Sequence, residues 1–432
     1  MNPTTTPHPG AFNTPRLRRN LIGLGLALGG GLVQAGYLTW ETVELPLSSG
    51  ASCGNGTPYR FFVNRTPFNR HYALTFEGGG ACWGQDACEG KTTLGAWNPD
   101  GIPTNYLTDL GKAPHGGLIS PLSARIDPFQ SVRTQAWNLV YLPYCTGDVH
   151  VGNATRVYAE ARPASPRVQY HRGQANIRAA SEWLRSHERQ VDQLMLTGFS
   201  AGGVGSTVNY AVVRDTLAPA GKMTLLADSG PLFNAPAGAT AQQAPSRPLH
   251  EKIRAAWNLD APGSIIPTLA AKVPGQDTTN MGTLSTALAR KYPQDRFAYL
   301  FFQQDMNFSA FSYTDFHPGI AGETNDALRK QRLNALWRQD IAQLLPTLDP
   351  LPNISYHVPF FRNFNDSHCL TVVDFWNTGV EDKGVASLTP FINSQLDRGP
   401  AMRNVEQDQS SDLNRPLSFG MAVLKLIQSL FG

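Results

Sequence analysis

A serine within a Gly-x-Ser-x-Gly pattern is the residue of this chain that most clearly predicts chemistry. Ser200 lies in Gly-Phe-Ser-Ala-Gly, residues 198–202, directly after the short apolar run 193–197 and before the run 204–217, which has helical spacing. A serine on such a strand-to-helix turn projects its hydroxyl from the sheet, near the positive end of the helix. The pattern therefore predicts that Ser200 is a nucleophile.

A serine hydroxyl is a weak nucleophile, so it needs a general base that is itself oriented by an acid. Where this turn occurs, the acid and the base follow the serine in sequence, at the ends of later strands. Asp305 follows the predicted strand 297–302, and His368 follows the predicted strand 354–358. We therefore predict a triad of Ser200, Asp305 and His368.

Other residues remain as alternatives for the acid and the base. Asp228 also ends a predicted strand, so it could replace Asp305 as the acid. Asp366 is too close in sequence to His368 to be its usual orienting partner. His317 precedes a proline and His357 lies inside a predicted strand, so both fit a structural role better.

Backbone N–H groups must also meet the negative charge that develops on an ester oxygen during attack. Residues 78–80 are three glycines at the end of the predicted strand 72–76, and Ala201 follows the nucleophile. A simple glycine turn is the alternative. Ordering three adjacent glycines has an entropic cost, so close approach of a ligand explains them better.

Strands alternating with helices predict an α/β fold with a mostly parallel central sheet that is flanked by helices. Alternation or apolar runs predict strands at 42–47, 59–64, 72–76, 137–142, 193–197, 223–227, 297–302 and 354–358. Helical spacing runs from Val168 to Arg185. The Pro/Ala-rich segment 231–294, with a weak helical patch at 249–257, is interpreted as a cap-like insertion.

The two ends of the chain are distinctive. Three arginines, an apolar run at 21–33 and a small residue at 35 predict a signal peptide over residues 1–35, with an uncleaved anchor as the alternative. Residues 36–432 would then form an exported, periplasmic or extracellular catalytic domain. The apolar segment 417–431 predicts a packed terminal helix or a surface-docking helix. No window is long and apolar enough for a conventional membrane span.

Composition excludes some functions. Hydrophobic residues make up 41% and charged residues 16% of the 432 positions, which is typical of a globular protein. The net charge of +3 comes from the three arginines of the leader, and the remainder balances 33 basic against 33 acidic residues. This balance gives no support for a nucleic-acid partner.

Five cysteines follow the leader: Cys53, Cys82, Cys88, Cys145 and Cys369. In an oxidising compartment the simplest arithmetic is two disulfides and one free thiol, and spacing alone leaves the pairing open. Zinc at Cys82 and Cys88 is a weak alternative, because no second pair accompanies them. We expect no metal or organic cofactor.

Several segments together resemble the pectin acetylesterase family of Notum-like serine hydrolases, over roughly residues 40–375. They are residues 53–58, 76–83, 144–148, 198–203, 228–230 and 368–369. The resemblance implies an α/β-hydrolase fold, the same triad, and oxyanion donors at Gly79, Gly80 and Ala201. Members of the family often carry a tryptophan near position 80 or 81, whereas here Trp83 follows the cysteine, so the wall of the acyl pocket is expected to differ.

The resemblance also implies the pairs Cys53–Cys145 and Cys82–Cys88, which leaves Cys369 unpaired beside the base. The resulting hypothesis is a monomeric serine esterase that removes acyl groups, above all acetyl, from an extracellular carbohydrate or another small ester. An esterase for longer, lipid-like acyl groups is the first alternative. A secreted binding protein without turnover is the second.

Overall fold

The computed structural model describes residue 37 and residues 39–407, except 108–119, 126, 128–129, 363–364, 373–374 and 376–377. The predicted signal peptide and the predicted helix at 417–431 lie outside the described residues. Within this part of the chain, no helix is both long enough and apolar enough to cross a bilayer.

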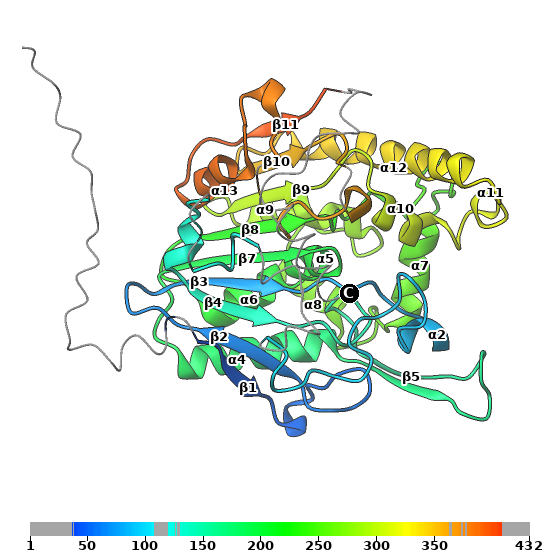
Figure 1. The fold of residues 1–432 in the computed structure, drawn as a ribbon, viewed down its shortest axis with the longest axis horizontal. Coiled ribbons are helices and arrows are strands. Elements are labelled where there is room, and N and C mark those ends of the chain that lie inside the picture. Colours follow the sequence, from blue (N-terminus) through cyan, green and yellow to red (C-terminus); the bar gives the residue numbers. More distant parts are fainter. Residues whose placement is uncertain are drawn as a thin grey trace, which may run out of the picture.

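A nine-stranded sheet forms the centre of the molecule, in the order β1-β2-β4-β3-β7-β8-β9-β10-β11 (Figure 1). β1 pairs with β2 and β2 with β4 in antiparallel fashion, and all other neighbours are parallel. The predicted mostly parallel sheet is thus confirmed. Its strands are β1 Glu41–Glu44, β2 Arg60–Asn64, β3 His71–Phe76, β4 Asn138–Leu142, β7 Gln193–Phe199, β8 Met223–Asp228, β9 Arg296–Leu300, β10 Ile354–Val358 and β11 Arg403–Val405.

Helices cover both faces of this sheet, because its inner strands are apolar on both sides. In β7, Leu194 and Leu196 belong to one buried cluster and Met195 to the other, as the two-residue period of a strand requires. The helices are α2 Gln85–Cys88, α4 Gly173–His187, α5 Ala201–Val208, α6 Tyr210–Leu217, α7 Arg247–Ala256, α8 Ile265–Lys272, α9 Leu284–Lys291, α10 Met306–Tyr313, α11 Pro318–Ala321, α12 Asp326–Leu348 and α13 Leu388–Leu396.

The helix predicted from Val168 to Arg185 is wrong over its first residues. Arg167–His171 forms β6, which pairs antiparallel with β5 Ala154–Tyr158 in a separate two-stranded sheet, and α4 begins only at Gly173. Gln169 and His171 are buried and contact the carbonyl of Thr146. These tertiary contacts, and not the local spacing, decide that the segment is extended. The run 204–217 is likewise two helices, α5 and α6, which meet at Asn209.

The predicted cap segment, residues 231–294, carries α7, α8, the short 3-10 helix η3 Met281–Thr283 and α9. α8 contacts α6, and α9 contacts β9, so these two helices belong to the layers around the sheet. Figure 1 shows α7 on the side toward which β3 and β4 point. That this segment covers the edge of the sheet stays a prediction, and α7 is the helix of the segment that is placed to do so.

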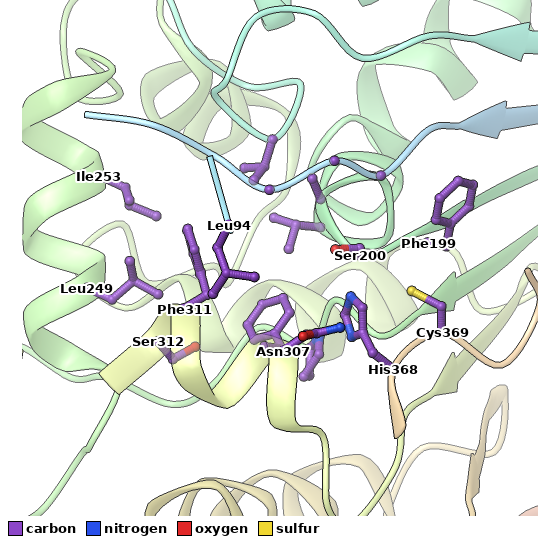
Figure 2. Close-up of a pocket in the computed structure, with 18 of the residues that line it drawn as sticks. Leu94, Phe199, Ser200, Leu249, Ile253, Asn307, Phe311, Ser312, His368 and Cys369 are labelled. Atoms are coloured by element: carbon purple, nitrogen blue, oxygen red, sulfur yellow. The ribbon is translucent and has the colours of Figure 1, made fainter. Parts of the chain in front are cut away.

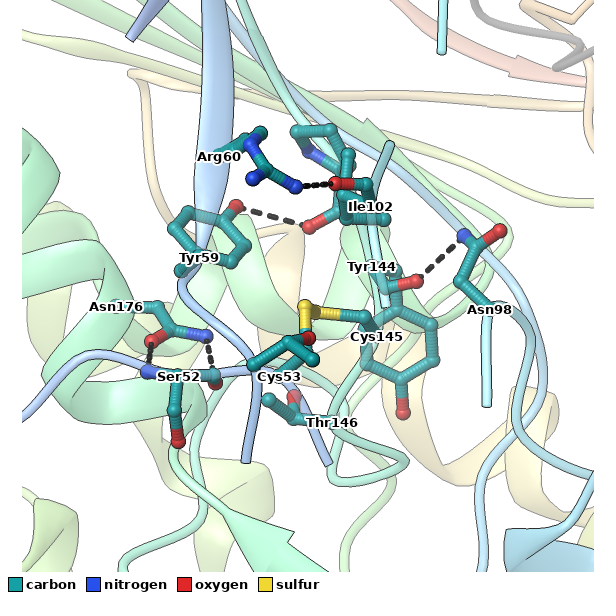
Figure 3. Close-up of a disulfide and its surroundings, with 12 residues drawn as sticks. Ser52, Cys53, Tyr59, Arg60, Asn98, Ile102, Tyr144, Cys145, Thr146 and Asn176 are labelled. Carbon is teal, nitrogen blue, oxygen red and sulfur yellow. Dashed lines mark hydrogen bonds between the residues drawn. A yellow bond between two sulfur atoms is a disulfide. The ribbon is translucent and has the colours of Figure 1, made fainter. Parts of the chain in front are cut away.

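Two disulfides form, with the pairing that the family resemblance implies. Cys53 pairs with Cys145 across 92 positions, and Cys82 pairs with Cys88. Figure 3 shows how hydrogen bonds fix the surroundings of the first bridge: Tyr59 donates to the carbonyl of Pro143, and Asn98 donates to the carbonyl of Tyr144. The loop after β4 is therefore tied to the loop before β2. Cys369 is free, as expected, and it is buried.

Candidate active site

Ser200 lies on a strained turn between β7 and α5. Its backbone angles are φ 56° and ψ −123°, a conformation that side-chain-bearing residues rarely adopt. The turn persists because the chain packs tightly around it. A Cβ on Gly202 would lie 2.0 Å from the carbonyl oxygen of Phe76, and a Cβ on Gly203 would lie 2.3 Å from that of Asp228. The N–H of Ser200 donates to the same Asp228 carbonyl at 2.9 Å.

His368 and Asp305 form the second part of the site. Nδ1 of His368 lies 2.7 Å from Oδ2 of Asp305, and both side chains are buried. The other carboxylate oxygen of Asp305 accepts the N–H of Phe308 and thereby caps α10. Figure 2 shows the imidazole of His368 turned toward the hydroxyl of Ser200. The structure thus brings the three residues of the predicted triad to one place.

The same contact affects the charge state of His368. Burial alone would lower the pKa of His368, but the charge of Asp305 and the hydrogen bond to it outweigh burial and raise the pKa above 6.5. Nδ1 is directed at the carboxylate, which leaves Nε2 as the nitrogen available to a serine proton. This is the arrangement that a general base requires.

Asp228, the alternative acid, does something else. Its carboxylate accepts the N–H groups of Leu370 and Thr371 and the hydroxyls of Thr371 and Ser229. Ser229 in turn accepts the N–H of Cys369. Asp228 therefore holds the segment that follows His368 and does not contact the imidazole through a hydrogen bond. Sequence reasoning found Asp228 but missed this function.

The alternative bases have structural partners, as the sequence predicted. Nε2 of His357 lies 2.7 Å from the carbonyl of Thr378, and burial lowers the pKa of His357 to about 4. Nε2 of His317 lies 3.0 Å from the carbonyl of Pro245. Neither residue lines the pocket that contains Ser200.

The glycines after β3 line this pocket together with Ala201. Gly79 and Gly80 have φ angles of 144° and 64°. A Cβ on Gly79 would collide with the Trp97 side chain at 2.7 Å, and a Cβ on Gly80 would lie 2.3 Å from the carbonyl oxygen of Leu94. Glycine is therefore needed here for close approach of the protein's own segment 94–97, which is a reason that the sequence did not reveal.

Glu77, just before these glycines, is a buried carboxylate that sequence reasoning missed. It accepts the hydroxyls of Tyr106 and Tyr141 and the N–H of Tyr144. Its backbone carbonyl lies 2.8 Å from Nε2 of His150. Glu77 thus joins the glycine loop to the disulfide-bound loop after β4. The signal in the sequence is an acid at the end of an apolar strand, directly before Gly78.

A cavity of about 500 Å³ opens beside Ser200 and His368, and most of its wall is apolar. Side chains from α7, α10, the loop after β3 and the loop after β8 line it. The apolar members include Leu94, Trp97, Val149, Phe199, Leu232, Phe233, Leu249, Ile253, Phe308 and Phe311. Trp83 does not line the cavity, but packs against Trp257 and Phe311, which do.

The zinc alternative for Cys82 and Cys88 does not fit the structure. These cysteines and His171 have ligand atoms within 4.8 Å of one another. The two sulfurs, however, are joined in a disulfide. Nδ1 of His171 lies 3.0 Å from the carbonyl of Thr146, and Nε2 lies 3.2 Å from the hydroxyl of Tyr158. The thiolates that zinc prefers are therefore not offered.

The mostly parallel sheet and the strained strand-to-helix turn define an α/β-hydrolase fold. Residues 34–247, just under half of the chain, match the family model described as Pectinacetylesterase. The chain is thus a relative of the pectin acetylesterases, as its motifs predict. That match includes Ser200 but ends before Asp305 and His368.

Individual proteins of known name are also similar to this chain. Pectin acetylesterase 4 of Arabidopsis thaliana is 28% identical over 45% of this chain and 45% of its own length. Palmitoleoyl-protein carboxylesterase NOTUM of Mus musculus is 26% identical over 44% of this chain and 35% of its own length. The matched region thus spans less than half of the length of these relatives. The solved Wnt deacylase Notum from Drosophila is similar with a TM-score of 0.54 and 17% identity, covering 86% of this chain and 97% of that one, which shows a shared fold.

Proposed function

We propose that this protein is a serine-dependent carboxylic ester hydrolase with Ser200 as nucleophile, His368 as general base and Asp305 as orienting acid. One observation carries the proposal. A buried imidazole, held by a carboxylate at 2.7 Å, faces a serine on a strained turn of an α/β-hydrolase sheet. The names of the relatives, pectin acetylesterase and palmitoleoyl-protein carboxylesterase, agree with ester hydrolysis.

The first half of the reaction is acylation of the serine. Nε2 of His368 takes the proton of the Ser200 hydroxyl while Oγ bonds to the ester carbonyl carbon. The tetrahedral intermediate then expels the alcohol, which leaves with the proton from His368. Asp305 holds the imidazole in the required tautomer and stabilises its positive charge.

The second half is hydrolysis of the acyl-enzyme. A water molecule gives its proton to His368 and attacks the acyl carbon, after which Ser200 regains its proton and the acid is released. In both halves the N–H groups of Gly79, Gly80 and Ala201 would donate to the oxyanion. This role is supported by their position in the wall of the same pocket.

For the substrate, we retain acyl esters of an extracellular carbohydrate, with acetyl as the first candidate group. The cavity supports a second candidate, a longer acyl chain, because about 500 Å³ of mostly apolar space exceeds what an acetyl group fills. Comparing p-nitrophenyl acetate with p-nitrophenyl octanoate separates the two. A higher kcat/KM for octanoate supports the longer chain, and a higher value for acetate supports the first candidate.

Export to the periplasm or the exterior is part of the proposal. Its support is the pair of disulfides, which persist in oxidising compartments. A test is to express the chain with and without residues 1–35 and to locate the product. Retention of the full-length chain in the cytoplasm with reduced cysteines would contradict export.

The proposed activity is tested with Ser200→Ala. We expect kcat on activated esters to fall at least about a thousandfold, with an unchanged melting temperature, because the nucleophile is lost while the packing remains. Ser186→Ala, an exposed serine of α4, serves as the matched control and should keep wild-type kcat. Wild-type kcat in Ser200→Ala would refute the proposal. An inactive wild-type protein would favour the alternative of a binding protein without turnover.

A further inference from the structure

The part of the pocket that lies away from Ser200 is not uniformly apolar. Three polar side chains, Ser246, His250 and Ser312, line it together with leucine, isoleucine and phenylalanine side chains. The proposed ester chemistry does not involve these three side chains. A polar group in an apolar pocket wall usually orients a ligand.

Helix α10 gives the position of this polar end. The helix begins directly after Asp305, and Asn307, Phe308, Phe311 and Ser312 of α10 all line the pocket. Ser312 lies seven positions after Asp305, which corresponds to a helical rise of about 10 Å. Figure 2 shows Ser312 on the opposite side of the pocket from Ser200.

Asp340 of α12 brings Ser246, His250 and Ser312 to the same end of the pocket. One oxygen of its buried carboxylate accepts both the N–H of Ser246 and the hydroxyl of Tyr313, at 3.1 and 2.8 Å. Tyr313 is the neighbour of Ser312, and His250 follows Ser246 by one helical turn, with its N–H on the Ser246 carbonyl. The start of α7 and the end of α10 therefore meet at Asp340.

The hydroxyl of Ser312 is buried and, within the part of the chain that the structure describes, has no hydrogen-bond partner. The Ser246 hydroxyl is a weaker case, because it lies beside the Asp340 carboxylate: burial raises the pKa of Asp340 to about 7, and the contacts with Tyr313 and Ser246 only partly offset this. Ser312 is therefore the residue on which the inference mainly rests. An unsatisfied buried hydroxyl is unfavourable unless a ligand or water completes it.

His250 adds a second hydrogen-bonding group. Its ring nitrogens make no hydrogen bond to the described residues. Although part of the ring is accessible from the pocket, desolvation and the nearby Arg247 and Arg254 lower the pKa of His250 to about 4. The imidazole is thus neutral at pH 7 and can donate one hydrogen bond and accept another.

We propose that Ser312 and His250, with Ser246 beside them, form a subsite for a hydroxyl group at the far end of the acyl chain. The inference rests on the proposed esterase function and names its substrate class: esters of hydroxy acids that carry a hydroxyl at the end of the acyl chain, away from the ester carbonyl. A hydroxyl both donates and accepts, so it can satisfy Ser312 and His250 together. The phenylalanines of α10 would contact the apolar part of the chain between the two ends.

The first test compares p-nitrophenyl 8-hydroxyoctanoate with p-nitrophenyl octanoate. We expect kcat/KM of the wild-type protein to favour the hydroxylated ester by about tenfold, the effect of a hydrogen bond made in a desolvated pocket. Ser312→Ala should reduce this ratio to about one. Ser309→Ala is the matched control: its buried hydroxyl belongs to the same helix, donates to the Met306 carbonyl and does not line the pocket, so the ratio should stay at the wild-type value.

The second test does not depend on turnover. Titration calorimetry of Ser200→Ala protein with 8-hydroxyoctanoate and octanoate should give about tenfold tighter binding of the hydroxylated acid, and adding Ser312→Ala should abolish the difference. Equal binding of the two acids, or a preference that survives Ser312→Ala, overturns the subsite. If the hydroxylated acid binds more tightly in a Ser312-dependent way but the wild-type protein hydrolyses no ester, the subsite is supported and the proposed esterase function is refuted.

Discussion

The two sides of the candidate active site are held in place by different kinds of contact. On the nucleophile side, backbone packs on backbone: Gly202 and Gly203 lie against the carbonyls of Phe76 and Asp228, and Gly80 lies against that of Leu94. On the base side, around His368, hydrogen bonds to buried carboxylates hold the chain in place. Asp305 holds the imidazole, and Asp228 holds the segment that follows it.

The base side also stores more backbone strain. Asn365, Asp366, Ser367 and Cys369, which surround His368, all have positive φ angles without being glycine. Such conformations persist only where the surroundings enforce them. The enforcing contacts are side-chain hydrogen bonds, for example from the N–H of Arg362 to the Ser367 hydroxyl. Substitutions of the packed glycines on the nucleophile side should therefore act mainly on folding, and those of the two carboxylates on the base side mainly on rate.

The largest expected effect on the base side is that of Asp305→Asn. An amide preserves the shape but favours the wrong imidazole tautomer, so kcat on activated esters should fall about ten-thousandfold, as in other serine triads. Asp315→Asn, an exposed residue nearby in sequence, is the control and should keep wild-type kcat. A loss of less than about tenfold in Asp305→Asn would show that another acid orients His368.

The nucleophile side is tested most severely by Gly202→Ala. The new methyl group would lie 2.0 Å from the Phe76 carbonyl oxygen, so we expect the free energy of unfolding to fall by about 3 kcal/mol. Chemical denaturation measures this change. In the control Gly319→Ala the nearest atom is 3.7 Å away, and stability should hardly change. Equal stability of the two variants would contradict a close-packed turn.

Asp228→Asn should affect rate more than substrate binding. The amide places an NH₂ group against N–H or hydroxyl donors, so the segment after His368 shifts, and we expect kcat to fall about thirtyfold with a nearly unchanged KM. Thr371→Val removes a single donor and should give a smaller loss. If Asp228→Asn mainly raised KM, the carboxylate would serve substrate binding instead.

The smallest expected effect is a shift of the pH profile. Only neutral His368 can accept the Ser200 proton, and its pKa is raised above 6.5, so kcat/KM should fall as the pH drops, with a midpoint above pH 6.5. Asp305→Asn should move this midpoint to lower pH. The contribution of the His368–Asp305 contact to the free energy of unfolding has the opposite pH dependence to activity. It is fully present below pH 6.5, the pKa of an unfolded histidine, and is lost as the pH rises through the raised pKa of folded His368. A midpoint below 6.5 in the wild-type protein would contradict the His368–Asp305 contact.

The same contrast explains what the sequence could predict. The nucleophile side is local: the Gly-x-Ser-x-Gly pattern, the adjacent strand and the glycines stand together in the chain, so Ser200 and the sheet around it could be predicted. Asp305 and His368 lie outside the matched family region, and they were predicted from their order relative to predicted strands and from the resemblance of residues 368–369 to the family.

Contacts between distant segments could not be predicted. The partners of Asp228, the Glu77–tyrosine cluster and the packing of residues 94–97 on Gly79 depend on tertiary placement, which no local pattern encodes. The predicted helix over β6 is wrong for the same reason, because burial of Gln169 and His171 overrides the local spacing. The polar end of the pocket likewise joins α7 and α10 through Asp340 on a third helix.

The most direct test of the account is covalent labelling with a fluorophosphonate, which reacts with serines activated by a neighbouring base. Intact mass and peptide mapping should find one adduct on Ser200 in the wild-type protein, none in Ser200→Ala, and strongly slowed labelling in His368→Ala. An adduct on a different residue, or labelling of Ser200 at the same rate without His368, would contradict the proposed triad.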